Sequence, residues 1–160
     1  MKKSDFFNRL QEEGKLQMVL PSEEIMSSYL KKSDSHLVSA KLLLKNNRLE
    51  ESVSLTYYSM YYMLLSLLFR VGIKCENHSA AIILLKELFS IDNSLISFAK
   101  KERIDKQYYV DFKIMKEEVK ELIEAAEIFN STIFDFIEKL NSEKIAEFRT
   151  KMETLLKPVK

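Results

Sequence analysis

Three residues near the middle of the chain carry groups that could act on a phosphate: Arg70, Lys74 and His78, around Gly72. Metal-free cleavage of RNA requires a base for the ribose 2′-hydroxyl and a cation for the charge that develops on the phosphate. Histidine titrates near neutrality, and arginine and lysine bind phosphate oxygens. We therefore take His78 and Arg70 as candidate catalytic residues and Lys74 as a candidate phosphate ligand.

Each of these residues also has a purely structural interpretation. His78 could be an ordinary residue in the first turn of a helix, bonded to a neighbouring group. Arg70 could neutralise the last carbonyls of the helix that it ends, and Lys74 could be a solvated loop lysine. The residue types alone leave both interpretations open.

Asn77 directly precedes His78 and is a typical helix N-cap residue. If it caps a helix, the free amides of the first turn favour a phosphate and lower the pKa of an adjacent imidazole. We therefore include Asn77 among the candidate nucleotide ligands.

Aromatic residues precede this turn in a band at 57, 58, 61 and 62, all tyrosines. Tyr57 and Tyr61 could stack on a base, but core packing with satisfied hydroxyls explains the band better. Arg103 is a further candidate nucleotide or RNA ligand, and its alternative is an ion pair with Asp105.

The element that must position these residues is a helix predicted over residues 47–71, with Asn47 as its N-cap. It is apolar or aromatic on nearly every face between Leu55 and Phe69, which is typical of a helix central to a bundle. Its apolar run is shorter than the roughly 20 residues of a membrane span. Gly72 is expected to end it in a left-handed conformation.

The rest of the chain also predicts helices, because it has only two Gly and two Pro. We expect a short helix over 4–13 ended by Gly14, a long helix over 22–46 capped by Ser22, and a helix over 78–89. Residues 90–106 are expected to form a loop. Helices over 112–140 and 143–156 follow, and no strand pattern is evident. In the helix over 112–140, apolar residues recur three and four apart, which predicts a packing seam in a bundle or across a dimer. The residues of this seam are Phe112, Met115, Val119, Leu122, Ala126, Phe129, Ile133, Phe136 and Leu140.

Composition sets further limits. The chain is expected to form one all-α domain over 1–160, with the core bundle at about 22–156. The single cysteine, Cys75, excludes a disulfide framework and a multi-cysteine zinc site, and no spacing indicates a metal or another cofactor. The net charge is +1, and no basic tail or arm is evident in the sequence. Strong non-specific binding of nucleic acid is therefore not expected. Without a signal-peptide or membrane pattern, we expect a cytoplasmic protein.

Several motifs, taken in order, resemble those of HEPN domain proteins, especially the small stand-alone members of archaea and bacteria. The first is a segment from Phe6 to Leu16, and the second is a helix ending in a small loop, Ser33 to Asn47. The third is Tyr57-Tyr58-Ser59-Met60 followed by leucines, a glycine turn and His78. The fourth is an Arg-x-Asp-x-x-Tyr element at 103–108.

The resemblance implies an up-and-down bundle of four to five helices that often dimerises. It also implies a minimal nucleotidyltransferase as a partner, in a toxin–antitoxin pair. Catalytic members of the family are metal-independent ribonucleases with four to six residues between an arginine and a histidine, and their site forms across a dimer.

The chain departs from that motif. Arg70 and His78 have seven residues between them, Lys74 and His78 have three, and Ala80 stands where members adenylylated by their partner have a tyrosine. We therefore favour a non-catalytic module that binds a nucleotidyltransferase, a nucleotide or RNA. The alternatives are a ribonuclease toxin that uses His78 with Arg70 or Lys74, and a structural homodimer that contacts its copy through residues 22–46 or 112–140.

Overall fold

Seven α-helices and one pair of short strands form the part of the chain that the computed structural model describes, residues 2–108 and 113–156. Their order is α1 (Lys3–Glu12), β1 (Leu16–Met18), α2 (Glu23–Lys45), α3 (Leu49–Val71), β2 (Ile73–Cys75), α4 (His78–Phe89), α5 (Ser94–Tyr108), α6 (Lys116–Glu138) and α7 (Ser142–Leu155). The predicted all-α bundle with a short N-terminal helix is confirmed.

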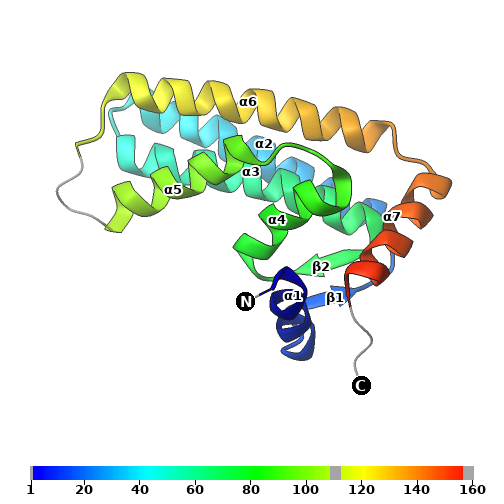
Figure 1. The fold of residues 1–160 in the computed structure, drawn as a ribbon. Helices are drawn as coiled ribbons and strands as arrows, with labels where there is room; N and C mark the ends of the chain where they lie inside the picture. Colours follow the sequence, from blue (N-terminus) through cyan, green and yellow to red (C-terminus); the bar gives the residue numbers. More distant parts are fainter. Residues whose placement is uncertain (1, 109–112, 157–160) are drawn as a thin grey trace.

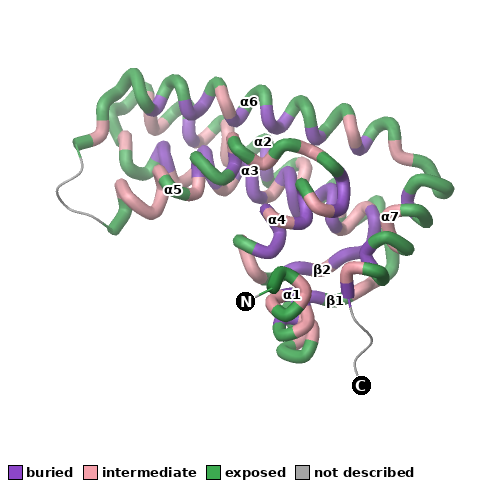
Figure 2. The backbone as a smooth tube through the Cα atoms, in the orientation of Figure 1, coloured by how far each residue is buried: buried purple, intermediate pink, exposed green. Residues whose placement is uncertain are grey.

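Helix α3 is the centre of the bundle. Helices α2, α5 and α6 lie along it, α4 lies against its middle and C-terminal half, and α7 packs near its C-terminal end (Figure 1). Its residues are buried on almost every face, among them Tyr57, Met60 and Leu64 at 0% exposure. The outer helices are buried only on the side that faces the bundle (Figure 2). This is the expected consequence of a helix that is apolar all round beside amphipathic ones.

Local signals at the helix ends mostly act as predicted. The Ser22 hydroxyl accepts from the Ile25 amide at 3.0 Å, and Gly72 ends α3 at φ +81°. Asn47 was expected to cap α3, and this prediction is wrong: Arg48 occupies the cap position, and Asn47 has φ +55° in the turn after α2. Asparagine tolerates that left-handed conformation better than most residues do.

The strand pair was not predicted. β1 and β2 are antiparallel, with Leu16 opposite Cys75 and Met18 opposite Ile73. Each strand has three residues, which is too short to display an alternating pattern in the sequence. The pair ties the segment before α2 to the segment between α3 and α4.

Helix α5 replaces the loop predicted for residues 90–106. It packs against α3 but has only two buried residues, Ile96 and Ala99. Because α5 buries only these two residues, its apolar positions are too few to show a helical period among the charged residues of the segment. This correction matters because α5 carries the cations of the site described below.

Helix α6 uses its apolar seam inside the bundle. Val119, Leu122, Ala126, Phe129 and Ile133 are all buried. The predicted start of this helix at Phe112 lies outside the described residues. Within residues 2–108 and 113–156, no helix is both long and apolar enough to cross a membrane.

Candidate functional site

His78 is the first residue of α4, and its position is fixed by the backbone on both sides. Upstream, β2 pairs with β1, and the Glu76 amide donates to the Lys15 carbonyl at 2.8 Å. Downstream, the Asn77 side chain accepts from the Ala80 amide at 2.9 Å, as the predicted N-cap. His78 is therefore held at a rigid corner between a strand and a helix.

The imidazole of His78 lies against the tyrosines of α3. Its Nδ1 is 2.8 Å from the Tyr57 hydroxyl. Its ring stacks on Tyr61 with centroids 3.8 Å apart and planes 13° apart. Tyr58 approaches edge-on, with ring centroids 6.2 Å apart. One ring face and one nitrogen of His78 are thus engaged by the protein itself.

Tyr57 and Tyr61 are buried, at 0% and 5% exposure. Burial raises the pKa of both phenols well above the usual range. Both hydroxyls therefore stay protonated at neutral pH, and Tyr57 hydrogen-bonds a neutral imidazole. In this structure the two candidate base-stacking residues support His78 from the core side.

Arg103 is brought to this site by α5. Its guanidinium carbon lies 5.0 Å from the Tyr57 ring centroid and 5.3 Å from that of Tyr58, and Nη1 donates to the Tyr58 hydroxyl at 3.2 Å. Such contacts with aromatic faces stabilise the cation. The expected ion pair with Asp105 is absent among the described residues, so that prediction is wrong. The buried Nε of Arg103 has no hydrogen-bond partner in the described part of the chain.

Lys100, one helical turn before Arg103, supplies a second cation. Its Nζ donates to the Ser79 hydroxyl at 2.5 Å, beside His78 in the first turn of α4. Partial burial, and next the charge of Arg103, lower the pKa of Lys100. Burial is also the main cause that lowers the pKa of His78, followed by the charges of Arg103 and Lys100. The site is thus a neutral imidazole flanked by two cations.

Arg70 and Lys74 lie elsewhere. Arg70 Nη2 is 3.2 Å from Glu23 Oε1, and its side chain is 19% exposed. Arg70 also follows Tyr61 by nine residues on α3, which separates the two by roughly 13 Å along the helix axis. Lys74 lies on β2, and its Nζ pairs with Glu76, just after the strand, at 3.3 Å. The fold therefore brings Arg103 to His78, whereas Arg70 forms an ion pair with Glu23.

Sequence reasoning missed Lys100 and Ser79, and it treated Tyr58 only as part of the core band. The signal for Lys100 was its spacing of three from Arg103, which places both on one face of a helix. That signal was lost because the segment was assigned to a loop. Ser79 carried no distinguishing pattern.

The described residues contain no group of three or more His, Cys, Asp and Glu side chains that could hold a metal ion. Cys75 is buried on β2, and burial raises the pKa of its thiol. A buried, protonated thiol is a poor nucleophile. The chemistry available at this site is therefore that of His78, the two cations and the hydroxyls.

Comparison with known proteins agrees with this architecture. The sequence profile of the HEPN domain family matches residues 26–151. A UPF0332 protein of Thermotoga maritima is 31% identical over 129 residues, which cover 74% of this chain and 95% of the relative. A UPF0332 protein of Pyrococcus horikoshii is 38% identical over 65 residues, 41% of this chain and 44% of the relative. The family match covers most of α2, the helices from α3 to α6 and most of α7, so this chain belongs to the HEPN domain family.

Proposed function

We propose that this chain is a non-catalytic HEPN module that binds the phosphate of a nucleotide or of RNA at the corner between α4 and α5. Family membership supports a nucleotide- or RNA-related role. The observation that carries the proposal is that α5 places two cations around a neutral His78: Lys100 contacts Ser79 in the first turn of α4, and Arg103 contacts the tyrosines of α3 that hold His78.

The donors at this corner suit a phosphate group. Arg103 Nε is a buried donor with no partner in the described residues, and Lys100 lies next to the first-turn residue Ser79. Arginine donates to phosphate in a forked geometry, and the amides at a helix N-terminus add further donors. His78, kept neutral, can hydrogen-bond a phosphate or a base without adding charge.

A binding role is favoured over catalysis because each chain contributes one imidazole to this corner, and the Nδ1 of that imidazole is already bonded to Tyr57. Cleavage of RNA uses both a base and an acid in the same site. The arginine of the expected motif, Arg70, is paired with Glu23. Lys74 is likewise paired, with Glu76.

The test measures fluorescence anisotropy of a labelled single-stranded RNA, with ATP as a competitor. Arg103→Gln and Lys100→Gln should each weaken binding roughly fivefold or more, and each should reduce the salt dependence by about one phosphate contact. Lys101→Gln is the matched control, because it removes the same charge from an exposed position on α5. Equal affinity of the Arg103→Gln variant and the wild type would contradict the proposal.

A ribonuclease is the second candidate, and the neutral His78 beside Arg103 favours it. In that mechanism His78 Nε2 would take the 2′-hydroxyl proton while Arg103, in place of Arg70, stabilised the phosphate charge. A metal-free assay on mixed RNA, with wild type and His78→Ala side by side, decides it. Cleavage lost in the variant would establish catalysis, and no cleavage by either protein would leave the binding role.

We further propose a minimal nucleotidyltransferase as partner and a homodimer as the working assembly. Val38 and Leu42, one turn apart on α2, are 58% and 56% exposed and would provide an apolar dimer contact. Light scattering of the wild type and of Val38→Lys/Leu42→Lys tests the dimer. Co-purification with a nucleotidyltransferase encoded beside this gene tests the partner, and failure of the two proteins to co-elute would count against it.

A further inference from the structure

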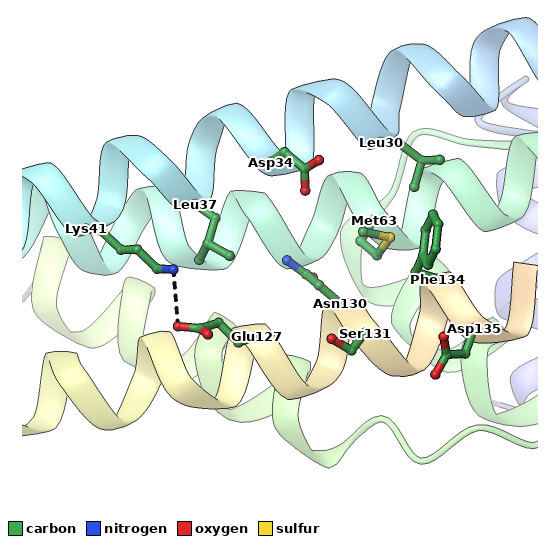
Figure 3. Close-up of a pocket in the computed structure, with 10 residues that line it drawn as sticks. All are labelled: Leu30, Asp34, Leu37, Lys41, Met63, Glu127, Asn130, Ser131, Phe134 and Asp135. Atoms are coloured by element: carbon green, nitrogen blue, oxygen red, sulfur yellow. Dashed lines mark ion pairs between the residues drawn. The ribbon is translucent and has the colours of Figure 1, made fainter.

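A second site lies on the face of α3 opposite to His78. Tyr57 and Tyr61 face His78, whereas Ser59 and Met63 are displaced from them by two residues, or about 200° around the helix. On this other face, Met63 forms the floor of a pocket of about 410 Å³ between α2 and α6 (Figure 3). The site thus shares a helix with the His78 corner but no side chain.

Asn130 is the polar group at the inner wall of this pocket. It extends from α6 into the space between α6 and α2 (Figure 3), and it is 7% exposed. Its Nδ2 donates to the Ser59 hydroxyl at 3.0 Å, but its Oδ1 has no hydrogen-bond partner among the described residues. An unsatisfied buried carbonyl oxygen costs free energy unless a donor reaches it.

Neighbouring hydroxyls fix the orientation of this amide. Ser59 donates its own hydrogen to the Ser33 carbonyl at 2.8 Å, and Ser33 donates to the Ser59 carbonyl at 2.7 Å. The Ser59 oxygen can therefore only accept from Asn130, which requires the amide nitrogen on that side. The acceptor Oδ1 is left for a donor that the protein does not provide.

The charge of the pocket is negative. Asp34 and Asp135 line it from α2 and α6 and form no ion pair with the described residues, while Glu127 is paired with Lys41 at 3.4 Å. Apolar walls come from Leu30, Leu37 and Phe134. Two unpaired carboxylates, a carbonyl acceptor and apolar walls would repel a phosphate and attract a cation with an aliphatic body.

We propose that this pocket binds a short aliphatic diamine or polyamine. One ammonium group donates to Asn130 Oδ1 and lies near Asp34, the methylene chain covers Leu30 and Phe134, and a second ammonium group pairs with Asp135 (Figure 3). The ligand completes the hydrogen bonding of the one buried amide in this wall. This inference is independent of phosphate binding at His78, because it uses the other face of α3 and the opposite charge.

The test is calorimetric titration of the full chain with 1,5-diaminopentane at low ionic strength, followed by amide chemical shifts in NMR spectra. The wild type should bind saturably at one site, with shifts confined to residues around Asp34 and Asn130. Asp34→Asn/Asp135→Asn should weaken binding roughly fivefold, because two partly screened ion pairs are lost. Both positions are exposed, so this variant is expected to fold.

Two controls and one further variant make the result decisive. Glu124→Gln removes an exposed carboxylate of α6 outside the pocket and should leave the affinity unchanged. Asn130→Ala should also weaken binding, and circular dichroism checks that it folds. 1,5-Pentanediol has the same length without charge and should not bind. No saturable binding by the wild type, equal loss in Glu124→Gln, or equal binding of the diol would each overturn the proposal.

Discussion

The guanidinium group of Arg149, on α7, closes over the turn at Gly72. Its Nη1 donates to the carbonyl oxygens of Val19, Val71 and Gly72 at 2.8, 2.9 and 3.0 Å. Residues more than 70 positions apart are thereby joined at the point where α3 passes into β2. This turn sets the path of the backbone toward Asn77 and His78, so its stability bears on the site.

Substitution of Gly72 by alanine should be strongly destabilising. Gly72 has φ +81°, and an added Cβ would lie 2.1 Å from Arg149 Nη1 and 2.4 Å from the Val19 carbonyl oxygen. We expect a loss of at least about 2 kcal/mol in the free energy of unfolding, measured with urea. Gly14→Ala is the matched control, because Gly14 has φ +73° but only Gln17 Nε2 nearby, at 3.4 Å. It should cost about 1 kcal/mol, and equal losses would show that steric contact at Gly72 is unimportant.

Replacing Arg149 by methionine keeps an apolar stem but removes the donors. Three carbonyl oxygens at the turn then lose a charged partner, and we expect the free energy of unfolding to fall by about 2 kcal/mol. Lys144→Met, at an exposed position on the same helix, should change it by less than about 0.5 kcal/mol. If Arg149→Met lowers the free energy of unfolding no more than Lys144→Met does, water replaces the guanidinium group without cost.

Ser59→Ala should weaken the contact between α2 and α3. The substitution removes the Ser59 hydroxyl, which donates to the Ser33 carbonyl and accepts from the Asn130 amide nitrogen, and both of these groups are buried. The expected loss is about 1–3 kcal/mol in urea unfolding. Ser28→Ala, which removes an exposed hydroxyl on α2, serves as the control and should be near neutral. Similar values for the two variants would refute a role for the buried network.

The histidine at the site predicts a pH dependence of stability. The pKa of His78 is lowered in the folded protein, so the unfolded chain takes up a proton first as the pH falls through about 6.5. At higher pH His78 is neutral in both the folded and the unfolded chain, so it does not contribute to the change of the free energy of unfolding with pH. The free energy of unfolding should therefore decrease more from pH 7.5 to pH 5.5 in the wild type than in His78→Gln. Parallel curves would show that His78 titrates alike in both states.

Helix α3 and the local signals around it were predictable from the sequence. An apolar run that covers every face of a helix has to be buried, and Ser22, Gly72 and Asn77 act through bonds within their own turns. These interactions extend over a few residues, so the sequence contains all that they need. The four motifs between Phe6 and Tyr108, taken in order, likewise indicated the HEPN family.

The identity of the cation beside His78 was decided by the tertiary structure. Arg70 is closer in sequence, but its helix carries it toward Glu23, whereas α5 folds back over α3 and brings Arg103 onto Tyr57 and Tyr58. The strand pair and the Arg149 contacts arise in the same way, from segments far apart in the chain. The sequence alone predicts which residue types are present and the local geometry around each. Whether two distant residues come into contact depends on how the helices cross, and the packing of the whole bundle determines those crossings.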